Sequence, residues 1–172
     1  QGGLRITSTI VKEHQEQAVA AAEGMNEVRG WDPTHQHVAL SSLDPATGEI
    51  LAEYAGADYL ARQQNAVTQD IAMAGSAFKP FALLANARLD GSVYDTYSGK
   101  SPQYFPGMSV PVSNDGGYSF GNVTLVRATE YSMNTAYVAL NLDVGPQRTL
   151  EAAIDAGIPE DTLGLNGELL NV

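Results

Sequence analysis

Hydrophobic and polar residues follow two different periods along the chain, and these periods predict its first elements. From Val11 to Met25, apolar residues recur at helical spacing among Lys, Glu and Gln, which predicts an amphipathic helix. Two strand-like runs follow at 37–43 and 50–55. The sequence Asp-Pro-Ala-Thr-Gly-Glu between them has a proline and a glycine at positions that favour a turn. The pattern therefore predicts a helix followed by an antiparallel hairpin.

The rest of the chain is mostly helical in pattern. Four helices are expected, at 76–89, 123–131, 135–143 and 146–156. The last has Pro146 just inside its start and Gly157 just past its end, as helices favour. The segment 92–121 is rich in Gly, Pro, Ser and Tyr, and a loop of this length within a domain is often functional. Together these elements predict an α+β fold, in which a two-stranded sheet alone would be only marginally stable. We therefore expect further strands to be missing from this chain, which begins at Gln1 without a Met and is expected to be a fragment.

Composition narrows the possible functions. The chain has 172 residues, which suits about one domain. Its 20 acidic and 9 basic residues give a net charge of -11, which disfavours nucleic acid and anionic lipid as partners. It has no cysteine, so disulfides, thiol catalysis and Cys-based metal sites are excluded. No apolar run approaches the ~18 residues of a membrane helix.

The most informative stretch is Gly75-Ser76-Ala77-Phe78-Lys79, at the start of a predicted helix. Residues three apart share a helix face, so the Lys79 amine can lie beside the Ser76 hydroxyl. A serine becomes a good nucleophile when a base takes its proton, and a lysine with a lowered pKa can be that base. The N–H groups at the helix start could hold a developing oxyanion. The alternative is a serine that caps the helix beside an exposed lysine.

Two further groups of polar residues have comparable alternatives. Ser132 and Asn134 precede a predicted helix and could be caps or parts of a site. His35 and His37 could bind a metal from a strand edge, but no third ligand is in view, so we expect them to be surface residues.

Several motifs, in order, make the chain resemble the transpeptidase domain of class A (bifunctional) penicillin-binding proteins. The segment 3–10 resembles the linker that follows the glycosyltransferase domain, and 38–52 resembles the opening hairpin. Gly75-Ser76-Ala77-Phe78-Lys79-Pro80-Phe81 is similar to the nucleophile motif, and Ser132-Met133-Asn134-Thr135 to the Ser-x-Asn element. The resemblance covers essentially all 172 residues and implies the N-terminal portion of one such domain, with residues 1–10 as a linker. It also implies an α/β/α layered, β-lactamase-like architecture.

The resemblance implies a role for each motif residue. Ser76 would form an acyl-enzyme with a D-Ala-D-Ala stem peptide or with a β-lactam, and Lys79 would be the base that activates it. Ser132 would relay a proton to the leaving amine. Asn134 would hydrogen-bond the substrate amide and Lys79. The resemblance therefore implies a peptidoglycan cross-linking enzyme that needs neither cofactor nor metal.

One family element is absent. No Lys-Thr-Gly or Lys-Ser-Gly sequence occurs in the chain, and this element normally supplies the other wall of the active site. We therefore expect these residues alone to acylate poorly, and either to pair with the missing C-terminal part of the domain or to self-associate. The resemblance also implies a location on the extracytoplasmic face of the cell membrane, with the parent protein anchored by an N-terminal helix that is absent here.

Two other functions remain open from the sequence. A serine β-lactamase shares Ser-x-x-Lys, but its class A members have Ser-Asp-Asn where this chain has Met133 in the middle position. A non-catalytic module that binds β-lactams is the other alternative.

Overall fold

The computed structural model describes residues 3–165 of the chain. The chain divides into two compact units, Gln1–Ala72 and Met73–Val172, each with its own packing. None of the helices among these described residues is both long and apolar enough to span a membrane.

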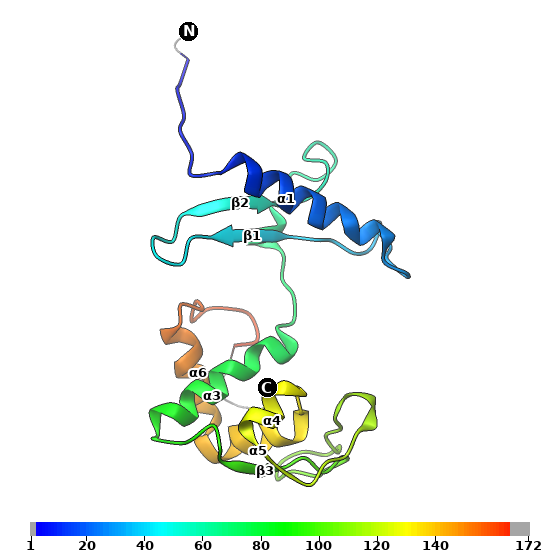
Figure 1. Cartoon of the computed structure of the whole chain (residues 1–172), viewed down its shortest axis with the longest axis vertical. Coiled ribbons are helices and arrows are strands. Elements are labelled where there is room, and N and C mark those ends of the chain that lie inside the picture. Colours follow the sequence, from blue (N-terminus) through cyan, green and yellow to red (C-terminus); the bar gives the residue numbers. More distant parts are fainter. Residues whose placement is uncertain (1–2, 166–172) are drawn as a thin grey trace. The chain divides into compact units, whose positions relative to one another are not determined.

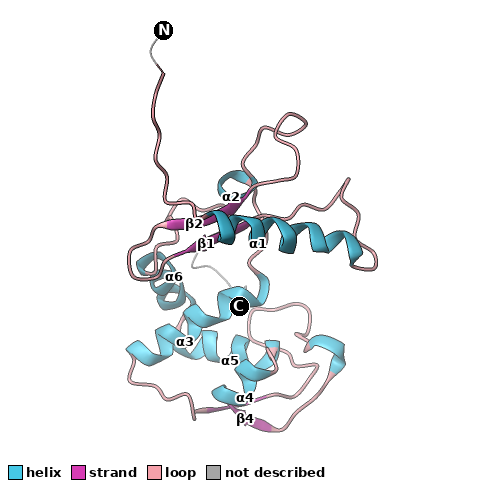
Figure 2. Cartoon of the chain, turned by 45° about the horizontal axis from the view of Figure 1, so that its top comes forward, coloured by secondary structure: helices cyan, strands magenta, loops and turns pink. Residues whose placement is uncertain are grey.

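The first unit is a helix on a hairpin. Its elements are α1 (Lys12–Glu23), a 3-10 turn (Gly24–Glu27), β1 (Leu40–Leu43), β2 (Ile50–Tyr54) and the short α2 (Ala66–Gln69). The two strands pair antiparallel, with Leu40 opposite Tyr54. Figures 1 and 2 show α1 lying along this sheet, where Ala18 and Ala22 are buried. The helix and the hairpin predicted from the sequence are confirmed.

The N-terminal part of the chain also covers the free edge of β2. The backbone N–H of Val11 donates to the carbonyl of Leu51 at 2.9 Å. The side-chain amide of Gln15 donates to the carbonyl of Glu53 and accepts from its N–H, both at 2.9 Å. These contacts satisfy edge groups that would otherwise be free to pair with another strand.

The second unit is mainly helical. Its elements are η2 (Gly75–Phe78), α3 (Lys79–Arg88), β3 (Thr96–Ser98), η3 (Asp115–Gly117), β4 (Asn122–Thr124), α4 (Leu125–Glu130), α5 (Asn134–Val144) and α6 (Pro146–Asp155). Helix α3 packs against both α5 and α6. Small side chains, including Ala82, Ala85 and Ala152, fill the core between them with Leu140 and Tyr137, so the helices lie close together.

The long segment 92–121 contains structure that the sequence pattern did not predict. β3 lies within it and pairs antiparallel with β4, with Thr96 opposite Thr124. The helix expected at 123–131 begins only at Leu125, because the preceding residues form β4. Each strand has three residues, too few to show a period of two. The chain is an α+β protein, as expected, but the second of the two small antiparallel sheets in its described residues was not predicted.

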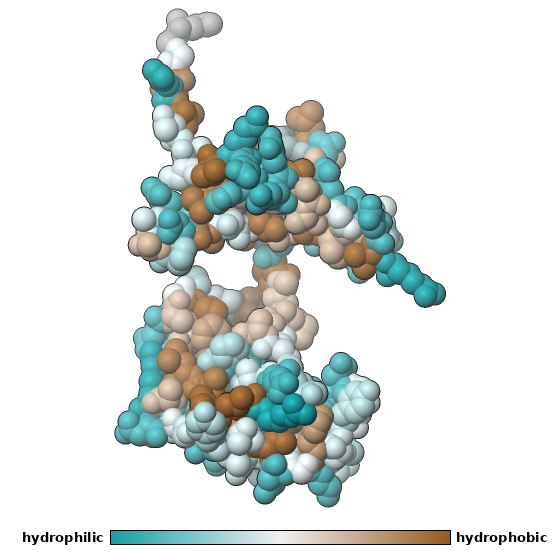
Figure 3. Space-filling model, in the orientation of Figure 1, coloured by the Kyte–Doolittle hydropathy of each residue, from teal (hydrophilic) through white to brown (hydrophobic). Residues whose placement is uncertain are grey.

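Apolar surface is visible on both units in the space-filling view (Figure 3). Leu43 and Ile50 of the hairpin and Leu84 of α3 are among the exposed large apolar side chains. On either unit, exposed apolar side chains that gather in a patch often mark a surface that another protein segment covers.

Candidate active site

Ser76 lies in the 3-10 turn η2, which continues directly into α3. Gly75 precedes it with a φ of 53°, a conformation that glycine adopts without steric cost. The Ser76 side chain is exposed and makes no hydrogen bond within residues 3–165. The motif serine is therefore presented to solvent at the start of a helix.

Lys79 is the first residue of α3 and is almost completely buried, with 3% of its surface exposed. Its Nζ donates to the Ser132 carbonyl at 2.7 Å, to Ser132 Oγ at 3.1 Å and to Asn134 Oδ1 at 2.7 Å. An ammonium group has three N–H donors, so all three are satisfied by two residues of the Ser-x-Asn motif.

Ser132 lies in the tight connection between α4 and α5 and has a φ of 49°, which is rare for a residue with a side chain. Two backbone hydrogen bonds hold this connection, from Ser132 N–H to the Thr129 carbonyl at 3.0 Å and from Met133 N–H to the Ala128 carbonyl at 2.9 Å. The Met133 side chain is buried in the hydrophobic core and thereby holds the connection against it. The resulting bend brings both the carbonyl and the hydroxyl of Ser132 to Lys79.

Asn134 is the first residue of α5, and both ends of its amide are bonded. Its Oδ1 accepts from Lys79, while its Nδ2 donates to the Ser113 carbonyl at 2.9 Å. Because Ser113 is an acceptor and Lys79 a donor, only one orientation of the amide satisfies both. A loop carbonyl thus fixes the amide that faces the lysine.

The burial of Lys79 changes its acid–base behaviour. Loss of water around the amine lowers the pKa of Lys79 from 10.5 to about 8. The ring of Tyr137 lies beneath it, with 5.5 Å between Nζ and the ring centroid. The Tyr137 hydroxyl bonds Thr129 Oγ1, which holds the ring in place. A buried amine with a pKa near neutrality can exchange a proton with a neighbouring hydroxyl.

The structure thus brings together Lys79, Ser132 and Asn134, three of the four residues expected from the sequence. Ser76 lies one helical turn before Lys79 along the chain, but its hydroxyl is not hydrogen-bonded to them. Sequence reasoning missed Ser113 and Tyr137. The only signal for Ser113 was its place in the long segment 92–121, and the carbonyl that it contributes is not visible in any motif.

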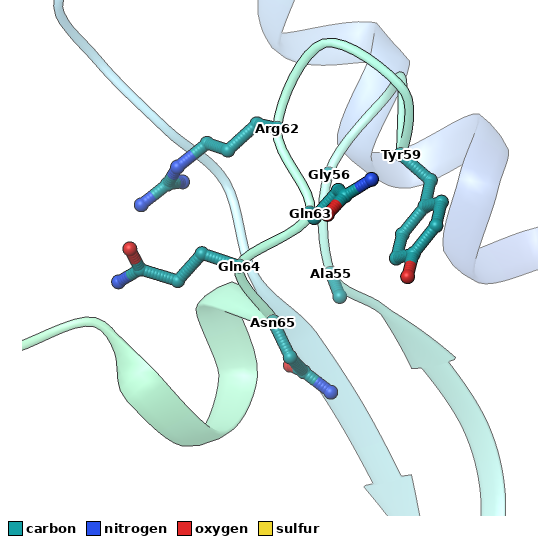
Figure 4. Close-up of a pocket in the computed structure, with 7 residues that line it drawn as sticks. All are labelled: Ala55, Gly56, Tyr59, Arg62, Gln63, Gln64 and Asn65. Carbon is teal, nitrogen blue, oxygen red and sulfur yellow. The ribbon is translucent and has the colours of Figure 1, made fainter.

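Among the described residues, two other candidate sites lack the groups that a metal site or an active site would need. The part of the chain that the structure describes contains no group of three metal-ligand side chains, so His35 and His37 have no third partner there. A hollow of about 160 Å³ lies in the first unit between the end of β2 and the loop that leads to α2 (Figure 4). Of its lining side chains, Arg62 pairs with Asp70 and Asn65 caps α2. It contains no motif residue.

Comparison with protein families gives one match that covers most of the chain. Residues 39–169 match the penicillin binding protein transpeptidase domain. This segment includes all four motif residues.

Known proteins similar in sequence share the same name. A penicillin-binding protein 1A of Mycolicibacterium smegmatis is 37% identical over 97% of this chain, which spans 20% of that protein. Penicillin-binding protein 1A of Neisseria flavescens is 34% identical over 62% of the chain, which corresponds to 14% of its own length. The chain therefore spans only about a fifth, or less, of these relatives.

Solved structures of penicillin-binding proteins are also similar to this chain. The penicillin-binding protein PonA1 of Mycobacterium tuberculosis in complex with penicillin V superposes with a TM-score of 0.78 and 30% identity, covering 93% of this chain and 41% of that one. A penicillin-binding protein 1A from Haemophilus influenzae superposes with a TM-score of 0.67 and 23% identity, over 75% of this chain and 20% of that one. The second similarity concerns the fold alone.

Proposed function

The chain belongs to the penicillin-binding protein transpeptidase family, and we propose that it is the N-terminal portion of a single domain that cross-links peptidoglycan stem peptides. In this proposal, the reaction passes through an acyl-enzyme on Ser76. The observation that carries the proposal is the buried Lys79 amine, held by Ser132 and Asn134 one helical turn after an exposed serine.

The first half of the reaction acylates Ser76. The neutral amine of Lys79 takes the Ser76 proton as Oγ attacks the carbonyl carbon of the penultimate D-Ala. The carbonyl oxygen becomes an oxyanion, and the Ser76 backbone N–H at the start of the helix is one donor to it. As the C–N bond breaks, the terminal D-Ala amine takes a proton through Ser132 Oγ, which lies 3.1 Å from Lys79 Nζ. Free D-Ala leaves, and the stem peptide stays on Ser76 as an ester.

The second half transfers the acyl group. An amine of a second stem peptide attacks the ester carbonyl carbon, so that a new amide bond forms and the bond from this carbon to Ser76 Oγ breaks. The amine gives up its proton through Ser132 to Lys79, and Lys79 returns a proton to Ser76 Oγ, which restores the hydroxyl. A β-lactam follows only the first half, because its opened ring stays attached and blocks the acceptor amine. Asn134 orients the substrate amide and Lys79 throughout. Because Lys79 and Ser132 carry the protons in every step, the proposed reaction needs neither cofactor nor metal.

These residues alone supply only part of the site. The sequence has no Lys-Thr-Gly or Lys-Ser-Gly element, so the second oxyanion donor comes from another part of the same domain. We infer that this C-terminal part also covers the exposed apolar residues of the hairpin and α3, and that without it the chain acylates poorly or self-associates. The substrate places the working protein on the extracytoplasmic face of the bacterial membrane, where an N-terminal helix of the parent protein would anchor it.

A fluorescent penicillin and a chromogenic cephalosporin together test the proposal on the intact protein that contains these residues. We expect one long-lived adduct per molecule and very slow release of hydrolysed cephalosporin. Rapid cephalosporin turnover would instead show a β-lactamase-type hydrolase. Reversible binding without an adduct would show a non-catalytic β-lactam-binding module.

A further inference from the structure

Asn114 is a buried residue in the segment between β3 and β4, and its side-chain amide is fully hydrogen-bonded. Its Nδ2 donates to the carbonyls of Gly99 at 3.1 Å and Tyr118 at 3.0 Å. Its Oδ1 accepts from the backbone N–H of Thr135 at 3.1 Å and from the Thr135 hydroxyl at 3.2 Å. An amide has two donor and two acceptor sites, so protein groups occupy every one of them. A fully satisfied buried network holds the groups it joins in one arrangement.

This network joins the same two segments that meet at the candidate site. Thr135 directly follows Asn134, and Ser113 directly precedes Asn114. The Ser113 carbonyl accepts from Asn134 Nδ2 at 2.9 Å, which leaves Asn134 Oδ1 facing Lys79 at 2.7 Å. The position of the Ser113 carbonyl therefore depends on where Asn114 is held.

The surrounding loop is shaped to receive Asn114. Gly116 and Gly117 have φ values of 61° and 70°, and this turn directs the Tyr118 carbonyl back to the Asn114 amide. At Gly99, a Cβ would lie 2.8 Å from the Phe120 Cβ, so only glycine fits without movement. The backbone N–H of Asn114 donates to a further loop side chain, the Ser101 hydroxyl, at 3.0 Å.

We propose that Asn114 is a positioning residue of the acylation site. It locks the Ser113 carbonyl to the start of α5 and thereby orients the Asn134 amide toward Lys79. The inference rests on the proposed function of Ser76 and Lys79. Asn114 makes no hydrogen bond to Lys79 or Ser76, so in this proposal it acts through Asn134.

Loss of the Asn114 amide affects the proton-transfer geometry more than the capture of substrate. Without it, the Ser113 carbonyl and Asn134 can move relative to each other, and Lys79 loses a fixed acceptor. A displacement of about 1 Å at such a site can slow chemistry by about a hundredfold. We expect Asn114→Ala to lower the first-order rate constant of acylation by about tenfold to a hundredfold, with a much smaller change in the dissociation constant of the non-covalent complex.

The test measures both constants from the concentration dependence of acylation of the intact protein by a fluorescent penicillin. Asn141→Ala is the matched control. Like Asn114, Asn141 is a buried asparagine, but it lies in α5 and faces α6 rather than the site. Its Oδ1 accepts from Thr149 Oγ1 of α6 at 2.6 Å. Both variants should lower the melting temperature, and only Asn114→Ala should slow acylation. An unchanged rate constant in Asn114→Ala, or an equal fall in both variants, would overturn the inference.

If Asn114→Ala does not fold, Thr135→Val decides the question. It keeps the side-chain shape and the backbone N–H and removes only the hydroxyl that donates to Asn114 Oδ1. A severalfold slower acylation supports the positioning role, and an unchanged rate constant refutes it. Failure of the proposed function would look different: the unsubstituted protein would form no adduct, or Ser76→Ala would still form one, and both ideas would then fall.

Discussion

Ser132 has a backbone conformation that its side chain disfavours, and this conformation directs its carbonyl to Lys79. With a φ of 49° it is one of two non-glycine residues with positive φ in the part of the chain that the structure describes. Such a conformation costs on the order of 1 kcal/mol or more and persists only where neighbouring contacts impose it. Here the anchors are the buried Met133 and the two backbone bonds to α4.

Two substitutions at Ser132 separate this strain from the chemistry of its hydroxyl. Both Ser132→Gly and Ser132→Ala remove the hydroxyl, so both should slow acylation. Glycine tolerates a positive φ, so Ser132→Gly should be more stable than Ser132→Ala by about 1 kcal/mol in thermal unfolding. A glycine variant that is less stable than the alanine variant would contradict the strain argument.

The buried amine of Lys79 predicts how acylation depends on pH. The base must be neutral, and the pKa of Lys79 is lowered by burial to about 8. The acylation rate constant should therefore rise with pH, with a midpoint at about 8, and level off above it. Rates measured with a fluorescent penicillin between about pH 6 and pH 10 test this expectation.

Lys79→Arg is the control for this profile. A guanidinium stays charged over the whole range, so the variant should be slower by about a hundredfold or more and show no rise. If the rate constant of the unsubstituted protein were still rising steeply at about pH 10, as expected for a solvated lysine with a pKa of 10.5, the burial argument would be wrong.

A residue of the candidate site can be predicted from the sequence when it contributes its side chain, and not when it contributes a backbone group. In the proposed reaction the chemistry is carried by four side chains at fixed spacing, which a motif can indicate: Ser76, Lys79, Ser132 and Asn134. Ser113 acts through a backbone carbonyl, which any residue has. The role of Asn114 depends on two chain segments that meet only in the folded protein.

At the scale of elements, α1 shows how side chains can extend a sheet. The amide of Gln15 pairs with the backbone of Glu53 in both directions, as a neighbouring strand would. The sequence predicted α1 from its apolar period, but Gln15 is polar and carried no such signal. Likewise, β3 and β4 were missed because their pairing is non-local, although the hairpin β1–β2 was predicted from its turn.

Gln15→Ala should loosen the edge of β2. Each lost hydrogen bond is worth about 1 kcal/mol, so the amide of Glu53 should exchange with deuterium about tenfold faster or more. Gln17→Ala, at an exposed position of the same helix, should leave this exchange unchanged. Equal protection in the two variants would show that the paired amide does not stabilise the edge.

At the scale of the whole molecule, the family match and the local geometry are two independent observations that support the proposed transpeptidase function. The family match covers residues 39–169, and the buried lysine with its two partners lies entirely within the second compact unit. The chain spans 20% of the Mycolicibacterium relative. Tests of the proposed reaction therefore need the intact protein that contains these residues. The net charge of -11 disfavours nucleic acid as a partner.

The central claim is that Ser76 is the residue that becomes acylated. The most direct measurement is the intact mass of the purified protein before and after penicillin, followed by mass mapping of the modified peptide. We predict a mass increase equal to one penicillin, located on the peptide that contains Ser76, and no increase for Ser76→Ala. No adduct on the unsubstituted protein, or an adduct that persists in Ser76→Ala, would contradict the account.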